Sequence, residues 1–425
     1  MNLPRSAVIV GGNRTPFVKA GTAYASASNQ DLLTAALDGL AARFGLSGAK
    51  LDEVAGGAVL KHSRDFNLTR EAVLGSALDP NTPAVDLQQA CDTGLETVIY
   101  IHNKISLGQA DVGVGAGVDS ASDAPITVTE GLRKALLKAN RAKNLQQRLA
   151  AFAAIRPHHL APVAPQVVEP RTGLSMGEHQ AATTARWGIT RSDQDELALA
   201  SHRNLAKAWD AGFFDDLVTG YLRVSRDTVL RPDTSMEKLA SLKPVFGGPN
   251  GTMTAGNSTA LTDGASSVLL AEQGWATAHG LPALARIVDA QVAAVDHVAG
   301  DDLLLGPTHA AARLLERQGM SLADFDFYEL HEAFASTVLA TLSAWESVAY
   351  CRDELGLSKP LGSIDRDKLN VYGSSLAAGH PFAATGGRIV ASLAKLLHER
   401  GSGSRGLVSI CAAGGQGVVA ILEAV

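Results

Sequence analysis

Short apolar runs alternate with amphipathic stretches along most of the chain. Residues 7–10, 54–60 and 110–118 are rich in β-branched and small apolar side chains, which predicts buried strands. The residues that recur at helical spacing between the last two runs are Leu95, Val98, Ile99, His102 and Ile105. This spacing predicts one face of a helix. Strands that alternate with helices are typical of an α/β protein, and we expect mainly parallel strands.

The C-terminal part repeats this order. Residues 283–290 and 325–330 read as strands, a helix follows, and 406–422 reads as a strand pair interrupted by glycines. The helix has a single apolar face that includes Ile389, Leu393 and Leu396. Each half places a reactive side chain at a helix start, Cys91 in one and His380 in the other. The sequence therefore predicts a duplicated fold whose two half-sites face each other.

The middle of the chain breaks the alternation and predicts an inserted cap. It is proline-rich at four positions between 157 and 170 and helical from 177 to 211. We expect an N-terminal half at 1–119, completed by about 262–281, an inserted cap domain at 120–261, and a C-terminal half at 282–425. Caps of this kind often cover a site and carry binding residues.

Composition indicates an ordered globular protein. Of 425 residues, 46% are hydrophobic and 19% are charged, which excludes general disorder. The net charge of -6 argues against a nucleic-acid binder. Residues 131–171 differ, because they hold eight basic side chains and one acid, Glu169. This basic window is a solvated helical face, a site for an anionic ligand, or a surface for an acidic partner or a membrane.

The three cysteines, Cys91, Cys351 and Cys411, cannot form a disulfide framework, and no C-x-x-C pair is present. We expect free thiols in a reducing compartment. The N-terminal apolar run, 7–10, is too short for a signal peptide. We therefore expect a cytoplasmic protein.

Three side chains, Cys91, His380 and Cys411, are candidates for catalytic chemistry. Cys91 precedes a helix start, where the dipole and free N–H groups should lower the pKa of a thiol and favour a nucleophilic thiolate. His380 lies in a glycine-rich loop and can activate a thiol or donate to an oxyanion. Cys411 enters a glycine turn and can act as a second acid or base. The competing interpretation of each is a passive, buried side chain.

Other motifs predict no metal or nucleotide site. His331-Glu332 begins like H-E-x-x-H, but residue 335 is alanine, so the zinc-protease motif is incomplete. His158-His159 lacks further ligands at metal-site spacing. The glycines at 113–117 match neither G-x-G-x-x-G nor a P-loop, and we expect them to serve packing or a backbone oxyanion hole.

Six segments in fixed order resemble the thiolase family. They are RTPFVKAGTAY (14–24), Cys91, NGTMTAGNSTALTDGAS (250–266), HEAFA (331–335), NVYGSSLAAGHPFAATGGR (370–388) and CAAGGQG (411–417). HEAFA, HPFAATG and the basic cap look like the 3-ketoacyl-CoA thiolases that form the β-subunit of fatty-acid oxidation complexes. The resemblance implies thiolytic cleavage of 3-ketoacyl-CoA on a five-layered αβαβα fold with a loop domain over the site.

The resemblance also implies a role for each site residue. Cys91 is acylated, His380 activates it and contributes to an oxyanion hole, and Cys411 moves the proton at the α-carbon. His331 replaces an asparagine that positions a water, and the N–H groups of Cys91 and Ala413 form a second hole. The residues that the resemblance places against coenzyme A are Met176, Phe246, Ser258, Thr259 and Phe334. For the coenzyme phosphates, Arg223 and Arg226 are both candidates.

The implied partners are acyl-CoA and coenzyme A as substrates, with no permanently bound cofactor. We expect a homodimer or tetramer and a hydratase/dehydrogenase subunit as a partner, with the basic cap as a candidate membrane contact. Alternatives are a biosynthetic acetoacetyl-CoA thiolase, a catalytically weak lipid-binding or scaffold subunit, and a decarboxylating ketoacyl synthase, which needs no second active thiol such as Cys411.

Two features depart from the family pattern. Asp92 follows the nucleophile, where a small residue is usual, and a carboxylate there should raise the pKa of the thiol unless it points away. Gly-Gly is common before the Gly-His-Pro stretch, but this chain has Ser374-Ser375 and Ala377-Ala378 there, which can alter the acyl pocket.

Overall fold

A ten-stranded mixed sheet forms the centre of the computed structural model, which describes residues 5–425. The strands run in the order β12-β13-β14-β11-β1-β10-β5-β3-β4, with β2 attached to β10. The first half of the sheet contains β1 (Ala7–Arg14), β2 (Val18–Lys19), β3 (Glu53–Gly56), β4 (Ala84–Asp86), β5 (Val112–Ser120) and β10 (Thr262–Glu272). The second half contains β11 (Ala285–Ala294), β12 (Phe327–Leu330), β13 (Arg405–Ala412) and β14 (Gln416–Ala424).

The strand pairings show a duplication. In the first half β1 is antiparallel to β10, β10 is antiparallel to β5, and β5 is parallel to β3. In the second half β11, β14, β13 and β12 repeat these senses in the same order. The two halves meet where Ile9 of β1 pairs with Ala285 of β11. The predicted duplicated fold is confirmed by this arrangement.

The expectation of mainly parallel strands was wrong. Parallel pairing joins β3 to β4, β3 to β5 and β12 to β13, whereas the longer ladders are antiparallel. One cause is the turn between β13 and β14, where Gly414 and Gly415 have φ of 80° and 72° and reverse the chain at once. Glycine adopts this left-handed region without steric cost.

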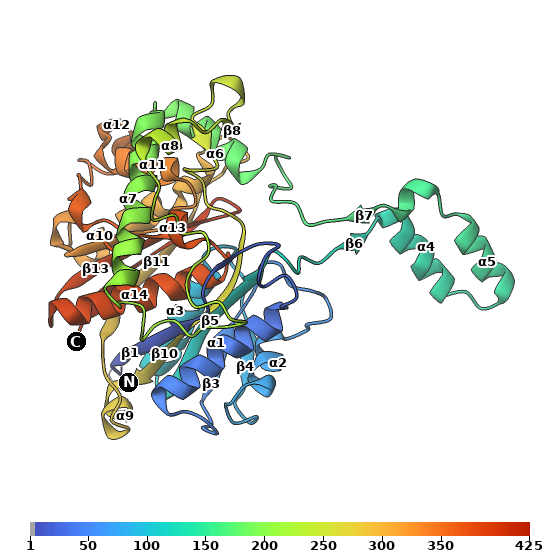
Figure 1. Cartoon of the computed structure of the whole chain (residues 1–425), viewed down its shortest axis with the longest axis horizontal. Helices are drawn as coiled ribbons and strands as arrows, with labels where there is room; N and C mark the ends of the chain where they lie inside the picture. Colours follow the sequence, from blue (N-terminus) through green and yellow to red (C-terminus); the bar gives the residue numbers. More distant parts are fainter. Residues whose placement is uncertain (1–4) are drawn as a thin grey trace.

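Helices form layers on and between the two half-sheets, as Figure 1 shows. The central layer holds α3 (Thr93–Ser106) and α14 (Ala384–Arg400), which contact each other and strands of both halves. One outer layer contains α1 (Asn29–Phe44) and α2 (Leu68–Gly75). The other contains α10 (Gly306–Gln318) and α11 (Ala335–Glu346). The remaining helices of the two halves are α9 (Gln273–Ala278), α12 (Val348–Asp353) and α13 (Ser375–Ala378).

Two glycines set the distance between the central helices. An added Cβ would lie 1.9 Å from the Ala383 carbonyl oxygen at Gly117 of β5, and 2.4 Å from the same oxygen at Gly94 of α3. Only glycine therefore allows α14 to begin so close to β5 and α3. Of the predicted apolar face of α3, Leu95, Val98 and Ile105 are fully buried, whereas Ile99 and His102 are only partly buried. The glycine-rich strand thus brings the segments after Cys91 and His380 side by side.

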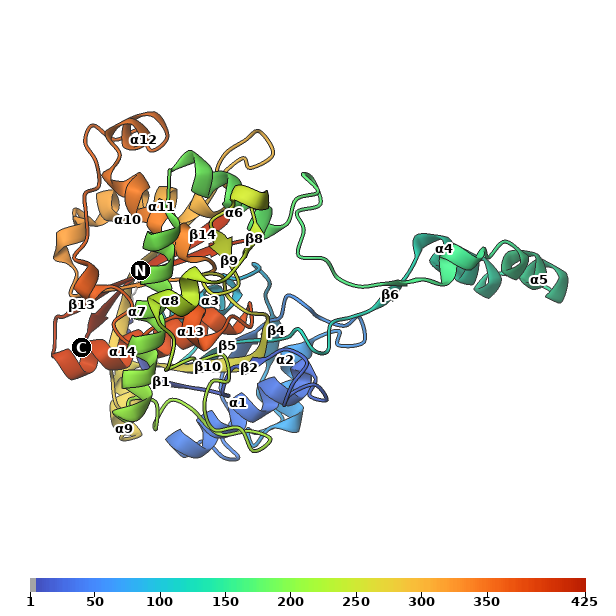
Figure 2. The same cartoon turned by 45° about the horizontal axis from the view of Figure 1, so that its top comes forward.

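The inserted region divides into two unlike parts. In the first part, α4 (Glu130–Asn140) and α5 (Leu145–Ala153) form a helical hairpin. A two-stranded sheet of β6 (Thr127–Val128) and β7 (Pro162–Val163) connects this hairpin to the body, from which the hairpin projects (Figures 1 and 2). The elements of the second part are α6 (Met176–Arg186), α7 (Arg191–Asp210), α8 (Met236–Ala240), β8 (Pro244–Phe246) and β9 (Met253–Thr254). This second part packs on α11 and α13.

Two expectations about the cap need correction. The predicted helix over 177–211 is two helices, because Gly188 between them has φ of 63° and ends α6. Six of the eight basic residues of the window belong to the hairpin, which projects from the body (Figure 2), and few hairpin residues, such as Ala135 and Ala151, are buried. The domain boundaries that we expect stay a prediction. No helix within residues 5–425 is both long and apolar enough to cross a membrane.

Candidate active site

The first half-site presents Cys91 on a tight turn between β4 and α3. Ala90 has φ of 47°, the left-handed region that non-glycine residues rarely occupy, and this turn places Cys91 one residue before the N-cap of the helix. Such backbone strain costs of order 1–3 kcal/mol and persists only where the surroundings hold it. Asp92 occupies the N-cap position of α3, but its side chain makes no capping hydrogen bond.

The second half-site presents His380 on the loop before α14. Its backbone N–H donates to Thr262 Oγ1 at 2.8 Å, and its Nδ1 lies 2.6 Å from Thr385 Oγ1. Its Nε2 lies 3.1 Å from Cys91 Sγ. Asp119 fixes the loop after the histidine by accepting the Ala383 N–H at 2.9 Å. Residues 289 positions apart thus form a hydrogen-bonded thiol and imidazole.

The turn after β13 completes the site. Cys411 is buried near the end of β13 and lines the same cavity as Cys91 and His380. The Ala413 N–H is hydrogen-bonded to the Cys91 sulfur and lowers its pKa, although other influences on this thiol are larger. The next amide, Gly414 N–H, donates to Glu169 Oε1 of the cap at 2.6 Å.

These residues open onto a cavity of about 250 Å³ with a mainly apolar lining. The lining includes every residue that the resemblance places against coenzyme A, namely Met176, Phe246, Ser258, Thr259 and Phe334. Phe246 and Phe334 meet edge to face with centroids 6.0 Å apart. Thr259 Oγ1 donates to the Ala333 carbonyl at 2.9 Å. An apolar channel with few polar groups suits a pantetheine arm and an acyl chain.

His331 lies behind this lining. It is 2% exposed, and its ring centroid is 4.2 Å from that of His380. Its Nδ1 lies 2.8 Å from Ser375 Oγ, while its Nε2 has no hydrogen-bond partner within 5–425. One donor atom from each of Cys91, His331 and His380 lies within 4.8 Å of the others. The structure thus brings all four predicted side chains together.

Burial dominates the electrostatics of the site, and it reverses our expectation for the pKa of the Cys91 thiol. The pKa of Cys91 is raised well above its ordinary value by desolvation, then by Cys411 and Asp92. Desolvation, with a smaller contribution from Arg388, lowers the pKa of His380 to about 3. The expected low thiol pKa was wrong, because desolvation and the neighbouring acidic groups outweigh the hydrogen bond from the Ala413 N–H. The resting pair is therefore a neutral thiol beside a neutral imidazole that can accept its proton.

Several candidates lie outside the cavity. Neither Arg223 nor Arg226 lines it, and Arg226 pairs instead with Asp210 at 3.1 Å. The adjacent His158 and His159 lie on the projecting hairpin, with ring centroids 4.3 Å apart. The basic residues of the hairpin also do not contribute to the cavity lining.

Sequence reasoning missed the site contacts of three side chains, including those of Ser375, which it had named only for the acyl pocket. Thr385 orients His380, Ser375 contacts His331, and Glu169 anchors the turn after Cys411. Glu169 carried one available signal, because it is the single acid in the basic window. It is 6% exposed, and an acid that is buried rather than solvated within a basic segment suggests a specific contact.

Comparison with known proteins places this geometry in a family. Residues 7–274 match the family "Thiolase, N-terminal domain", and residues 281–424 match "Thiolase, C-terminal domain". The chain belongs to the thiolase family. The two matches together span both half-sites, including Cys91 and His380.

Individual thiolases are similar over nearly the full length. A "3-ketoacyl-CoA thiolase" of Yersinia pestis (strain Pestoides F) is 40% identical over 422 residues, which cover 98% of this chain and 96% of the relative. One from Yersinia pseudotuberculosis serotype O:1b (strain IP 31758) has the same identity and coverage. Among solved structures, the Bacillus anthracis acetyl-CoA acetyltransferase has a TM-score of 0.81 at 31% identity, with 100% of both chains covered. Human mitochondrial 3-ketoacyl-CoA thiolase has a TM-score of 0.80 at 27% identity, again with 100% of both chains covered. The thiolase fold is therefore confirmed.

Proposed function

We propose that the protein is a 3-ketoacyl-CoA thiolase, which cleaves 3-ketoacyl-CoA with coenzyme A to give acetyl-CoA and a shortened acyl-CoA in fatty-acid β-oxidation. The observation that carries the proposal is that two thiols, Cys91 and Cys411, line one apolar cavity together with the His380 imidazole, whose Nε2 lies 3.1 Å from Cys91 Sγ. The 3-ketoacyl-CoA thiolases of Yersinia, at 40% identity over 98% of this chain, support it.

The first half-reaction breaks the carbon–carbon bond. His380 Nε2 takes the proton of Cys91, and the sulfur attacks the 3-keto carbon of the substrate. The C2–C3 bond then breaks, its electrons pass into the acetyl-CoA enolate, and Cys411 gives its proton to C2. The remaining acyl group stays on Cys91 as a thioester.

The second half-reaction releases the shortened product. The Cys411 thiolate takes the proton of an incoming coenzyme A thiol, and that sulfur attacks the acyl-Cys91 carbonyl. In this proposal the N–H groups of Cys91 and Ala413 stabilise the resulting oxyanion. Collapse returns Cys91 as a thiolate, which recovers its proton from His380. Coenzyme A is thus a substrate, and we propose no permanently bound cofactor.

Cleavage assays test the proposal. Wild type should cleave acetoacetyl-CoA or longer 3-ketoacyl-CoA, and Cys91→Ala should abolish it; equal rates in both would reject the assignment. Cys411→Ser should form acyl-enzyme from saturated acyl-CoA yet fail to cleave the carbon–carbon bond. Normal turnover by this variant would remove Cys411 from the mechanism.

The synthetic direction is the second candidate, supported by the likeness to the Bacillus anthracis acetyl-CoA acetyltransferase structure. Condensation of two acetyl-CoA molecules uses the same groups in reverse. Comparing cleavage rates for acetoacetyl-CoA and longer ketoacyl-CoA distinguishes the two, because a biosynthetic enzyme should prefer the four-carbon substrate.

We also propose a homodimer or tetramer in the cytoplasm, associated with a hydratase/dehydrogenase subunit. The three free thiols support the location, and the edge position of β4 supports strand pairing between subunits. Sedimentation of the purified protein and of a co-expressed pair tests the assembly.

The projecting hairpin is the candidate membrane contact. The exposed apolar residues that support it are Leu136, Leu137, Leu145, Leu149 and Phe152, and they share the hairpin with six basic side chains. Exposed apolar groups beside cations suit an anionic lipid surface. Co-sedimentation with anionic and zwitterionic vesicles, using protein with and without residues 127–163, tests this contact.

A further inference from the structure

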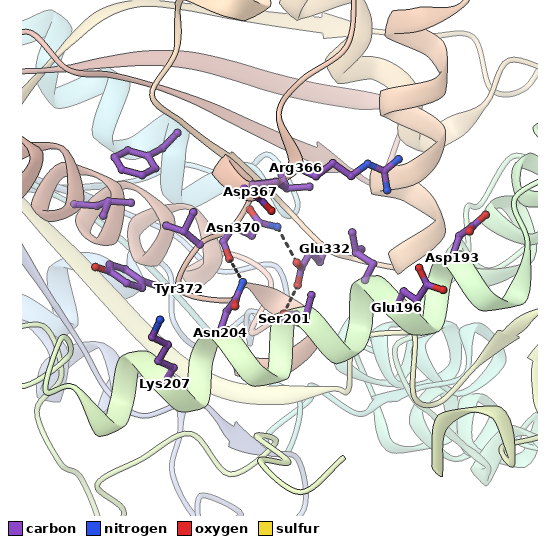
Figure 3. Close-up of a pocket in the computed structure, with 16 residues that line it drawn as sticks. Asp193, Glu196, Ser201, Asn204, Lys207, Glu332, Arg366, Asp367, Asn370 and Tyr372 are labelled. Carbon is purple, nitrogen blue, oxygen red and sulfur yellow. Dashed lines mark hydrogen bonds between the residues drawn. The ribbon is translucent and has the colours of Figure 1, made fainter. Parts of the chain in front are cut away.

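The segment that carries His331 is fixed on the side away from the cavity. The His331 N–H donates to the Ser409 carbonyl at 2.8 Å, which continues the pairing of β12 with β13. The next residue, Glu332, points the opposite way, into a buried polar cluster beneath a groove beside α7 (Figure 3). Its carboxylate accepts hydrogen bonds from Ser201 Oγ at 2.7 Å and Asn370 Nδ2 at 2.8 Å. The backbone on both sides of His331 is therefore held.

The imidazole of His331 is held by a second set of contacts. Ser375 Oγ lies 2.8 Å from His331 Nδ1 and accepts a hydrogen bond from Arg388 Nη2 at 3.0 Å. All three side chains are buried, with Ser375 at 0% and Arg388 at 5% exposure. Within residues 5–425, His331 and Arg388 are the hydrogen-bond partners of this hydroxyl.

This arrangement decides which ring nitrogen carries the proton. A guanidinium has no acceptor, so the Ser375 oxygen accepts from Arg388 and its own proton must find another partner. His331 Nδ1 is the acceptor in reach. The reverse arrangement, with Nδ1–H donating to Ser375, would leave the hydroxyl proton buried without a partner, which costs about 1–3 kcal/mol. The neutral ring therefore carries its proton on Nε2.

Burial keeps the ring neutral. Desolvation lowers the pKa of His331 well below its ordinary value, and His380 and Arg388 lower it further. Its Nε2 has no partner among the residues that the structure describes, although a ring nitrogen lies within 4.8 Å of Cys91 Sγ. A buried N–H donor beside the nucleophile is suited to an oxygen that gains negative charge during the reaction.

We propose that Ser375, backed by Arg388, is a positioning residue that holds His331 as the Nε2–H tautomer and aims this N–H at the thioester oxygen of the departing acetyl-CoA enolate, directly or through one water. The proposal rests on the thiolase function proposed above. It gives Ser375, one of the departures from the family pattern, a specific part in the chemistry.

Ser374 supplies a matched control. It is also buried and accepts from the same Arg388 Nη2, at 3.1 Å, but it does not contact His331. Ser374→Ala therefore perturbs Arg388 and leaves the His331 hydrogen bond in place. Ser375→Thr keeps the hydroxyl and serves as the conservative rescue.

The kinetic test compares these variants in 3-ketoacyl-CoA cleavage. Ser375→Ala should lower kcat by about 10- to 100-fold, since a misaimed group costs up to roughly 100-fold, and should change KM by less than about threefold. Ser374→Ala and Ser375→Thr should stay within about fivefold of wild type. His331→Gln keeps an N–H donor near the position of Nε2 but removes the imidazole that Ser375 orients. Adding Ser375→Ala to this variant should therefore lower kcat by less than about threefold.

Several results would overturn the proposal: wild-type kcat in Ser375→Ala, an equal loss in Ser374→Ala, or a full additional loss in the double variant. If Ser375→Ala does not fold by circular dichroism, Ser375→Cys, with its weak S–H donor, carries the same comparison. A wild type without cleavage activity would reject the proposed function instead. The tautomer can still be read then from ¹⁵N-histidine spectra, using the signal that His331→Gln removes; a proton on Nδ1 would contradict the inference.

Discussion

Asp92 is the least expected group near the nucleophile, and its replacement by asparagine gives a quantitative prediction. Its side chain is 0% exposed, and neither carboxyl oxygen has a hydrogen-bond partner within 5–425. Desolvation, and then Glu96, raise its pKa well above the ordinary value. A carboxyl in this state remains protonated in the folded protein and ionises on unfolding.

The magnitude follows from proton linkage. Between the unfolded pKa and the raised folded pKa, the native state holds more protons than the unfolded state, so stability falls as pH rises. With an unfolded pKa of about 3.9 and about 1.4 kcal/mol per unit, keeping the group neutral at pH 7 costs up to about 4 kcal/mol. An asparagine avoids this cost, but its unpartnered amide costs about 1–3 kcal/mol. Asp92→Asn should therefore stabilise the protein at pH 7 by about 1–3 kcal/mol.

Urea unfolding at pH 5 and pH 7, at one protein concentration, measures the effect. The advantage of Asp92→Asn should be near zero at pH 5 and should grow by about 3 kcal/mol between the two pH values. Glu96→Gln, one turn later on α3 and partly exposed, is the control and should show a smaller pH dependence. A pH-independent difference, or a variant less stable than wild type at pH 7, would refute the reasoning.

Two further substitutions test how the site is held, and a third tests a buried ion pair. Glu169→Ala removes the acceptor of the Gly414 N–H and should lower kcat by about tenfold and stability by about 1.5–3 kcal/mol, measured by cleavage kinetics and urea unfolding. An unchanged kcat would contradict its anchoring role. Gly117→Ala places a Cβ 1.9 Å from the Ala383 carbonyl oxygen, so it should destabilise the folded protein by about 1–3 kcal/mol and slow cleavage. A wild-type melting temperature would show instead that the start of α14 can move. Arg14 forms a buried ion pair with Asp227 at 2.6 Å. Arg14→Ala leaves Asp227 without its partner and should lower the unfolding free energy by about 3–5 kcal/mol, whereas a loss below about 1 kcal/mol would mean that water replaces the arginine.

The local pattern of the chain was sufficient for several of the helices and strands and for identifying the candidate reactive side chains. Helical spacing after residue 93 and glycine-interrupted strands near the C-terminus predicted α3, β13 and β14 in nearly their observed positions. Cys91, His380, Cys411 and HEAFA lie in short segments whose order indicated the family. Patterns of this kind report on backbone conformation and on the chemical groups available.

Whether neighbouring strands run parallel or antiparallel was decided by the tertiary structure. The same alternation of strand and helix is compatible with parallel or antiparallel ladders, and β10 joins β5 and β1 only after the long insertion has left the sheet. The projection of the α4–α5 hairpin likewise depends on what its residues fail to bury, which composition does not show.

The chemistry of the site was also decided by the tertiary structure. The sequence supplied a thiol before a helix and so predicted a low pKa, but packing removed the water around Cys91 and raised it. The contacts of Glu169 with Gly414 and of Ser375 with His331 join segments 245 and 44 residues apart. Sequence by itself determined which groups this protein has and which helices and strands carry them. Tertiary structure determined their distances and their exposure to water, because both depend on the packing of segments that are remote along the chain.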